Sequence, residues 1–156
     1  MHPNKEVLPE SIIKKGSILK VLTTSFPQVI KLASPSLPTD HPVTSVRVLV
    51  GPEFLQFNQF QIAHFFSQTY QIANNSSRMG YRLEGTPIPL NNQPALISSG
   101  IVPGTVQINN AGMPIVLMRD AQTTGGYPRM ATVLEEDIDR LAQMKPQEKI
   151  RFVFIK

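Results

Sequence analysis

The sequence predicts a mainly β domain, a barrel or a sandwich whose ends are covered by two short helices. Many short apolar or β-branched runs are bounded by Gly, Pro or Asn, as strands and their turns are. Only two stretches have the apolar spacing of a helix, and strands do not alternate with helices as they do around a parallel sheet. With 156 residues, of which 41% are hydrophobic and 17% charged, the chain suits one globular domain.

Residues 1–44 contain six prolines. They are Pro3, Pro9, Pro27, Pro35, Pro38 and Pro42. This density excludes long helices, because proline lacks a backbone N–H and its ring clashes with the preceding turn. We expect an arm or edge structure here, with short strands over 16–22 and 28–32, followed by a domain over 45–156.

The domain begins with residues 46–50, a β-branched run that predicts a strand ended by Gly51-Pro52. A short helix is expected over 57–66. Asn58 and Gln61 have the spacing of a capping box at its start, and apolar residues recur along it at helical intervals.

A second helix is expected over 134–143. Acidic residues occupy its first turn, which the helix dipole favours, and Leu134, Ile138 and Leu141 lie on one face. Pro146 ends it. The remaining short runs predict strands over 70–73, 78–84, 96–98, 105–109, 114–118, 130–133 and 150–155.

Composition and charge narrow the classes of partner and site. The net charge is +4, but the cations are spread over both ends of the chain without interleaved aromatics, so we expect no nucleic-acid partner. No apolar run of about twenty residues and no secretory signal is visible, so we expect no membrane partner and a cytoplasmic location. Cysteine is absent and the three histidines lie outside the polar clusters, so no metal site is expected.

Residues 78–84 alternate between a polar and an apolar face. The polar face carries Arg78, Gly80, Arg82 and Glu84, and the core face carries Met79, Tyr81 and Leu83. Two guanidiniums that flank a glycine let a ligand carboxylate approach the strand closely. The alternative is an exposed barrel face on which an arginine pairs with an acid such as Glu84. In the strand expected over 105–109, alternation turns Gln107 outward. Its amide is there either a hydrogen-bonding group for a ligand or an ordinary surface group.

The stretch DAQTTGGYP, residues 120–128, follows the apolar strand expected over 114–118. Gly125-Gly126 permits positive φ, so backbone N–H groups can form an anion-binding nest, to which Thr123-Thr124 adds hydroxyls. A GxxxxGK[ST] phosphate loop is excluded, because no lysine follows and Tyr127-Pro128 favours extended backbone over a helix. The alternative is a hairpin turn with the two glycines at its tip.

Several of these stretches together resemble one family. They are SSRMGYRLEG at 76–85, SSG at 98–100, GTVQ at 104–107, GMPI at 112–115, DAQTTGGYP at 120–128, and the C-terminal Gln143, Pro146 and Arg151-Phe152. From about Val46 onward the chain is similar to the biotin-dependent carboxyltransferase-like family. That family includes the C subunit of bacterial 5-oxoprolinase, also called allophanate hydrolase subunit 2 or KipA, and part of the carboxyltransferase domain of urea carboxylase.

The resemblance implies a cyclophilin-like closed β-barrel. It also implies an N-terminal subdomain that is missing from this sequence, with residues 1–44 as the arm and linker toward it. The family pattern usually has Glu, Pro, Arg and Gly at places where this sequence has other residues. The departures are Ser99 for Glu, Asn109 and Asn110 for Pro, Ala121 for Arg, and Gln147 for Gly.

The implied function is that of an enzyme subunit: the C-terminal part of a subunit of a heteromeric ATP-dependent 5-oxoprolinase, which opens the lactam C–N bond of 5-oxoproline to give glutamate. The isolated chain is expected to be inactive. One alternative is the carboxyltransferase component of a biotin-dependent urea or amide carboxylase, and another is a KipA-like regulatory module that antagonises a KipI-like partner. A prolyl isomerase rests on the fold alone, which does not establish function.

The implied partners are a KipI-like protein, also called allophanate hydrolase subunit 1, a third 5-oxoprolinase subunit, and a small amide or lactam substrate. No intrinsic cofactor is expected; ATP, and carboxybiotin in the carboxylase alternative, would act at the level of the complex. The implied catalytic residues are Asp120, Arg78 and Arg82, and the implied substrate-binding residues are Tyr81, Gln107, Gln122, Thr123, Thr124, Gly125, Gly126 and Tyr127. Asp120 would accept a hydrogen bond from a substrate N–H, while an arginine steadies a carboxylate or oxyanion.

Overall fold

The computed structural model describes residues 43–90 and 96–155. The strands expected over 16–22 and 28–32 lie outside the described residues, as does the rest of the expected N-terminal arm up to residue 42.

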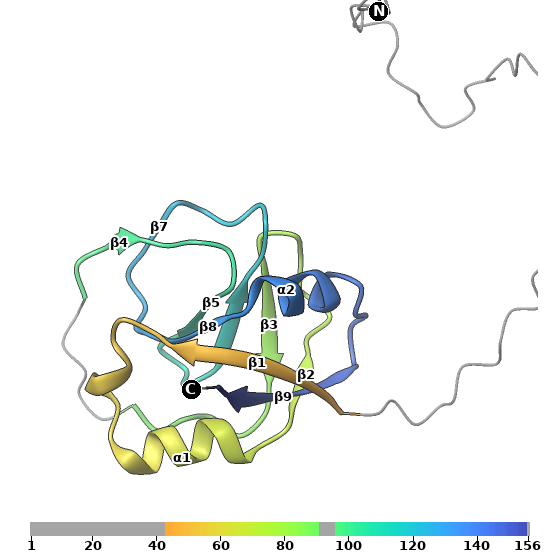
Figure 1. Cartoon of the computed structure of the whole chain (residues 1–156). Helices are drawn as coiled ribbons and strands as arrows, with labels where there is room; N and C mark the ends of the chain where they lie inside the picture. The colour runs from red at the N-terminus through yellow and green to blue at the C-terminus, as the bar shows by residue number, and fades with distance from the viewer. Residues whose placement is uncertain (1–42, 91–95, 156) are drawn as a thin grey trace, which may run out of the picture. The chain divides into compact units, whose positions relative to one another are not determined.

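Within the described residues, seven strands close into a barrel in the order β1-β8-β5-β6-β3-β2-β9 (Figure 1). They are β1 (Thr44–Val50), β2 (Tyr70–Ile72), β3 (Gly80–Glu84), β5 (Thr105–Ile108), β6 (Pro114–Leu117), β8 (Arg129–Val133) and β9 (Lys149–Phe154). Neighbouring strands are antiparallel except β1 and β9, whose parallel pairing closes the barrel. The predicted mainly β fold with a closed barrel and two short helices is confirmed.

Two very short strands, β4 (Ser99–Gly100) and β7 (Thr124–Gly125), form a separate antiparallel ribbon. Ser99 pairs with Gly125, and Gly100 pairs with Thr124. The strand expected over 96–98 is therefore wrong: pairing starts only at residue 99, where the chain comes alongside β7. We call this pair of strands the β4–β7 ribbon.

The two expected helices are present as α1 (Gln59–Ser67) and α2 (Glu135–Ala142), and a short 3-10 turn covers Phe54–Gln56. The capping box is confirmed at the start of α1: the Gln61 N–H donates to Asn58 Oδ1 at 2.9 Å, and the Asn58 N–H donates to Gln61 Oε1 at 2.8 Å.

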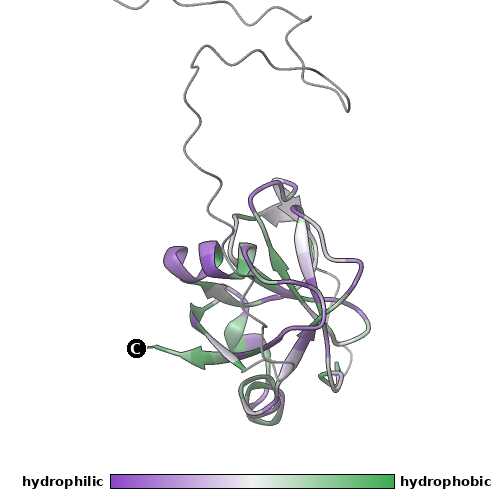
Figure 2. Cartoon of the chain, turned by 90° about the vertical axis from the view of Figure 1, so that its right-hand side faces the viewer, coloured by the Kyte–Doolittle hydropathy of each residue, from purple (hydrophilic) through white to green (hydrophobic). Residues whose placement is uncertain are grey.

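The barrel interior is filled by apolar side chains, and α1 covers one end of it (Figure 1). Phe65 of α1 is fully buried and stacks on Phe152 of β9 with ring centroids 4.7 Å apart, and Tyr70 packs on the same ring at 5.5 Å. In Figure 2 the barrel strands show both hydrophobic and hydrophilic stretches, whereas α2, the helix at mid-height, is mostly hydrophilic. Helix α2 therefore needs more than its two buried apolar residues, Ile138 and Leu141, to hold it on the barrel.

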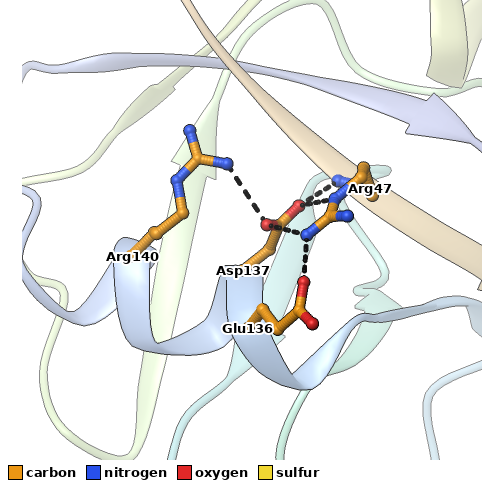
Figure 3. Close-up of polar contacts among 4 residues, drawn as sticks. All are labelled: Arg47, Glu136, Asp137 and Arg140. Carbon is orange, nitrogen blue, oxygen red and sulfur yellow. Dashed lines mark hydrogen bonds and ion pairs between the residues drawn. The ribbon is translucent and has the colours of Figure 1, made fainter.

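A buried carboxylate supplies that attachment (Figure 3). Asp137 of α2 is 1% exposed and accepts three hydrogen bonds from Arg47 of β1, from the backbone N–H at 2.7 Å, Nη2 at 2.9 Å and Nε at 3.1 Å. Arg140 adds a contact at 3.2 Å, and Glu136 binds the same Arg47 guanidinium at 2.7 Å. The hydrogen bonds from Arg47 hold the pKa of Asp137 below its usual range.

Alternation along residues 78–84 is only partly as predicted. Leu83 is buried and Tyr81 is half-buried, as expected of a core face, but Met79 is 53% exposed. The reason is that β3 begins at Gly80, and Met79 lies in a turn in which the backbones of Ser77 and Gly80 exchange two hydrogen bonds of 3.1 Å. The period of two holds only inside the strand.

Candidate functional site

Strand β3 borders two hollows, because its alternate residues point to opposite faces. Gly80 and Arg82 line the first hollow, whereas Tyr81 lines the second. The expected site residues divide between these two places.

The first hollow has a volume of about 250 Å³ and lies over β3, β5 and β6. Its polar lining is Asn75, Ser77, Arg82, Gln107, Gln122 and Tyr127, and its apolar lining is Met79 together with Ile115 and Leu117 of β6. Because three of its polar side chains are carboxamides, we call it the amide cavity. It brings together four of the expected site residues from three separate segments: Arg82, Gln107, Gln122 and Tyr127.

Gln107 is 2% exposed, so the interpretation of it as ordinary surface is wrong. It does point away from the core that holds Val106 and Ile108, but the β4–β7 ribbon covers it. Its Nε2 donates to the carbonyl oxygen of Tyr127 at 3.4 Å. Its Oε1 has no hydrogen-bond partner among the described residues, so a residue that lines the cavity carries a buried acceptor without a partner there.

Gly125 and Gly126 fit neither of the two expectations for this stretch, an anion-binding nest or the tip of a hairpin turn. Among the described residues positive φ occurs at Gly104, Gly112 and Gln147, and therefore not at Gly125 or Gly126. An anion-binding nest is thus absent there, and so is a turn tip, because Gly125 belongs to β7. Gly125 is needed instead for close approach: a Cβ on it would lie 2.6 Å from Gln107 Nε2 and 3.0 Å from Ile101 Cδ1.

Arg82 carries the one positive charge of the amide cavity's lining in the described part of the chain. Its backbone is fixed by Ser76, whose Oγ accepts from the Arg82 N–H at 3.1 Å and donates to the Arg82 carbonyl oxygen at 3.2 Å. The expected pairing of an arginine with an acid is found at Arg78, which pairs with Asp120, and not at Arg82. The Arg82 guanidinium makes no hydrogen bond or ion pair with any described residue. The guanidinium is therefore available to an anion.

The second hollow lies against α2 and has a volume of about 250 Å³. We call it the α2 hollow; its lining is Arg78, Tyr81, Met118, Arg119, Asp120 and Ala142. Arg78 Nη2 and Asp120 Oδ2 form an ion pair at 2.6 Å with side chains 87% and 45% exposed. Because the pair is solvated, it holds the two side chains together without adding much stability.

Tyr81 lies at the inner side of the α2 hollow. Its hydroxyl, with one proton to donate, lies 3.4 Å from the carbonyl oxygen of Met144 and 3.5 Å from that of Ala142. Burial, with a smaller contribution from the charge of Glu148, raises the pKa of Tyr81, so the phenol remains protonated and a donor at neutral pH. Tyr81 therefore anchors the C-terminal end of α2 and lies apart from the amide cavity.

The remaining expected residues surround the amide cavity without lining it. Thr123 and Thr124 are exposed, and the Thr123 carbonyl oxygen accepts from the Ile101 N–H at 3.0 Å, beside the β4–β7 pairing. Gly126 borders a further hollow of about 300 Å³ together with Leu96, Asn110 and Tyr127.

Sequence reasoning missed Asn75, Ser77 and the β6 side chains of the amide cavity. A polar turn placed directly before an arginine-bearing strand was the signal that could have found the first two. It also missed Glu53 and Arg129, whose side chains form an ion pair behind the β4–β7 ribbon. No local pattern marks that pair, because 76 residues separate its members.

The size and lining of the amide cavity limit what it can hold. Its volume of about 250 Å³ is below the range of about 300–1,000 Å³ that accommodates drug-sized ligands, so it suits a small polar molecule. In the described part of the chain, no cluster of three or more His, Cys, Asp or Glu side chains is placed to hold a metal ion. Among residues 43–90 and 96–155, no helix has the length and apolar character needed to cross a membrane.

Comparison with known proteins identifies relatives. The family described as "Carboxyltransferase domain, subdomain A and B" matches residues 8–154. The C subunit of the 5-oxoprolinase of Escherichia coli K12 is 44% identical over 108 residues, and its counterpart in Haemophilus influenzae is 37% identical over 107 residues. Each alignment covers 69% of this chain and 35% of the relative, so the chain spans about a third of the length of these curated proteins.

A solved structure shares the fold. The urea carboxylase of Kluyveromyces lactis matches with a TM-score of 0.68 at 22% identity, over 76% of this chain and 12% of that one. At this identity the likeness concerns the barrel alone.

Proposed function

The chain belongs to the carboxyltransferase domain family, subdomains A and B, and we propose that it is the C-terminal part of a subunit of a heteromeric ATP-dependent 5-oxoprolinase. The observation that carries this proposal is the 44% identity to the C subunit of a 5-oxoprolinase over 108 residues. The proposed reaction is hydrolysis of the lactam C–N bond of 5-oxoproline to give glutamate, driven by ATP.

The amide cavity fits the polar groups of that substrate. A five-membered lactam with a carboxylate presents one negative charge, one N–H donor and one carbonyl acceptor. The unpartnered Arg82 guanidinium suits the carboxylate, which it can bind through two N–H groups. The buried Gln107 Oε1 suits the lactam N–H, because a buried acceptor without a partner is costly until a donor reaches it.

The proposed catalytic role of Asp120 and Arg78 depends on where the substrate lies. They face the α2 hollow rather than the amide cavity, so they act on the reacting group only where the substrate, or a second protein that carries it, spans the edge between the two hollows. Their ion pair at 2.6 Å already positions the carboxylate. Asp120 would then accept a hydrogen bond from an N–H of the reacting group.

The partners of the proposed complex are a KipI-like protein and a third 5-oxoprolinase subunit, and its location is cytoplasmic. ATP would bind elsewhere in the complex, since the volume of the amide cavity, about 250 Å³, suits a smaller molecule. A biotin-dependent urea or amide carboxylase uses the same barrel, and a KipA-like regulatory module would use it without turnover. The following experiment distinguishes both alternatives from the proposed function.

The experiment is reconstitution of the complex from this protein, a KipI-like partner and a third subunit. Glutamate formation should require 5-oxoproline, ATP and all three proteins, and this chain alone should be inactive. Biotin-dependent carboxylation of urea in place of glutamate formation would move the function to the carboxylase alternative. Binding to the KipI-like partner without either reaction would favour the regulatory alternative.

Asp120→Asn tests the catalytic assignment in the same complex. The substitution keeps the shape of the side chain and removes its charge, so we expect kcat to fall by about 100-fold, a typical loss for a positioned catalytic group. The thermal midpoint should stay nearly unchanged, because the Arg78–Asp120 pair is solvated. Unchanged turnover would remove Asp120 from the catalytic residues.

A further inference from the structure

Arg129 of β8 and Glu53 form a largely buried ion pair beside the β4–β7 ribbon. Their side chains are 17% and 13% exposed. Arg129 Nε donates to Glu53 Oε2 at 2.6 Å, the Arg129 backbone N–H donates to the same oxygen at 3.0 Å, and Nη2 binds Glu53 Oε1. The bonds from Arg129 hold the pKa of Glu53 below its usual range. Such a two-pronged pair fixes the plane and direction of the guanidinium.

The remaining arm of that guanidinium reaches the ribbon. Arg129 Nη1 donates to the carbonyl oxygen of Gly100 at 2.8 Å. Gly100 belongs to β4 and pairs with Thr124 of β7. Because two paired strands of two residues each are marginal on their own, this charge-assisted bond from the barrel wall adds to the contacts that hold the ribbon in place.

The ribbon in turn covers Gln107, the buried amide of the cavity. Gly125 of β7 lies so close to Gln107 that a Cβ would approach its Nε2 to 2.6 Å. The pairing of β5 with β8 shifts register between Val106 and Gln107, and Gln107 is there opposite Arg129 itself. Irregularities of this kind re-aim a side chain and recur beside binding sites. Arg129 therefore takes part in both supports of the Gln107 amide: it binds the β4–β7 ribbon, and it belongs to β8, the strand that pairs with β5 at Gln107.

We propose that Arg129, clamped by Glu53, is a positioning residue that holds the β4–β7 ribbon over Gln107 and so fixes the Gln107 amide as one wall of the amide cavity. The identity of the ligand in that cavity rests on the proposed function, whereas the positioning role of Arg129 does not. Buried ion pairs often add little net stability, so the geometry that this pair fixes is the more direct reading of its role.

The test uses Arg129→Lys, which keeps the charge that pairs with Glu53 but loses the planar fork that spans Glu53 and Gly100. In a ¹H–¹⁵N NMR spectrum of the chain, the side-chain NH₂ signal of Gln107 should move toward the position of an exposed glutamine. In the assembled complex, KM for 5-oxoproline should rise about tenfold with kcat within about twofold, as expected when one charge-assisted hydrogen bond that shapes the site is lost.

Two further variants make the result decisive. Arg140→Lys alters an exposed arginine that pairs with Asp137 on α2, and it should leave both the Gln107 signal and KM unchanged. Glu53→Gln removes the other half of the clamp and should move the Gln107 signal in the same direction. A Gln107 signal unmoved in folded Arg129→Lys and Glu53→Gln overturns the positioning role. If the Gln107 signal moves in these variants but the wild-type complex makes no glutamate, the positioning role is supported and the proposed function is contradicted.

Discussion

At the scale of the residue, the contact between Gly125 and Gln107 gives a prediction with a matched control. Gly125→Ala would place a Cβ 2.6 Å from Gln107 Nε2 and displace that amide, whereas Gly126→Ala meets its nearest atom, Ser98 Oγ, at 3.4 Å, an ordinary contact. We expect KM for 5-oxoproline to rise about tenfold in the first variant and less than about twofold in the second, in line with the loss of one good hydrogen bond. Equal KM values in the two variants would contradict the assignment of Gln107 to the site.

Gln147 provides a second prediction at this scale. It is the non-glycine residue with positive φ, 75°, among those described, at a position where the resemblance to the family predicts glycine. A left-handed backbone costs a residue with a Cβ about 1–2 kcal/mol. Gln147→Gly should therefore be more stable than Gln147→Ala by about 1 kcal/mol in urea denaturation, since both lose the same side-chain contacts and only glycine relieves the backbone. An alanine variant as stable as the glycine variant would contradict this account of the departure.

Gln107 also shows why part of the site could not be predicted from the sequence. Alternation with Val106 correctly put its side chain on the face away from the core, but the residues that bury it lie about twenty positions further along the chain. Local patterns carry no information about such a cover. Arg82 was predictable, because a strand with a guanidinium beside a glycine has a recognisable composition.

At the scale of the element, helices and strands were predictable where a local signal decides them. The capping box placed the start of α1, and β-branched runs placed β1 and β6. The signal failed at Leu96–Ser98 and Met79, where an apolar residue lies next to a strand but outside its hydrogen-bonded ladder. Strand ends depend on the partner strand, which a single sequence does not reveal.

The attachment of α2 through Asp137 predicts a pH dependence of stability. The folded-state pKa of Asp137 is lowered, so its contribution is complete above the unfolded pKa of about 3.9 and is lost as the pH falls through the folded value. The difference in unfolding free energy between wild type and Asp137→Asn should be constant at about 2 kcal/mol from about pH 7 to 5 and shrink below about pH 4. Urea denaturation at several pH values measures it. A difference that grows as the pH falls would contradict the role of Arg47 (Figure 3).

At the scale of the whole molecule, periodicity left a barrel and a sandwich open, because closure depends on contacts between the two ends of the domain. Val46 of β1 pairs with Phe152 of β9, and no local pattern reports such a pairing. The resemblance to a family supplied the closed barrel, and the structure confirms it. The strand order also explains the site: β5, β6 and β3 are neighbours on one wall of the barrel, and the amide cavity forms over them.

The central claim is that the amide cavity holds the carboxylate of 5-oxoproline through Arg82. The most direct measurement compares wild type with Arg82→Ala in the assembled complex, using 5-oxoproline and its analogue 2-pyrrolidinone, which has the lactam ring without the carboxylate. Arg151→Ala, at an exposed arginine of β9 away from the cavity, is the control. The three proteins should be equally stable, because neither arginine is part of the core.

The account predicts that Arg82→Ala raises KM for 5-oxoproline about 30-fold, which corresponds to the loss of about 2 kcal/mol from a charge-assisted pair. The inhibition constant of 2-pyrrolidinone should stay within about twofold of wild type, since that ligand offers the guanidinium no charge. Arg151→Ala should change neither value. An unchanged KM in Arg82→Ala, or an equal weakening of both ligands, would contradict the claim.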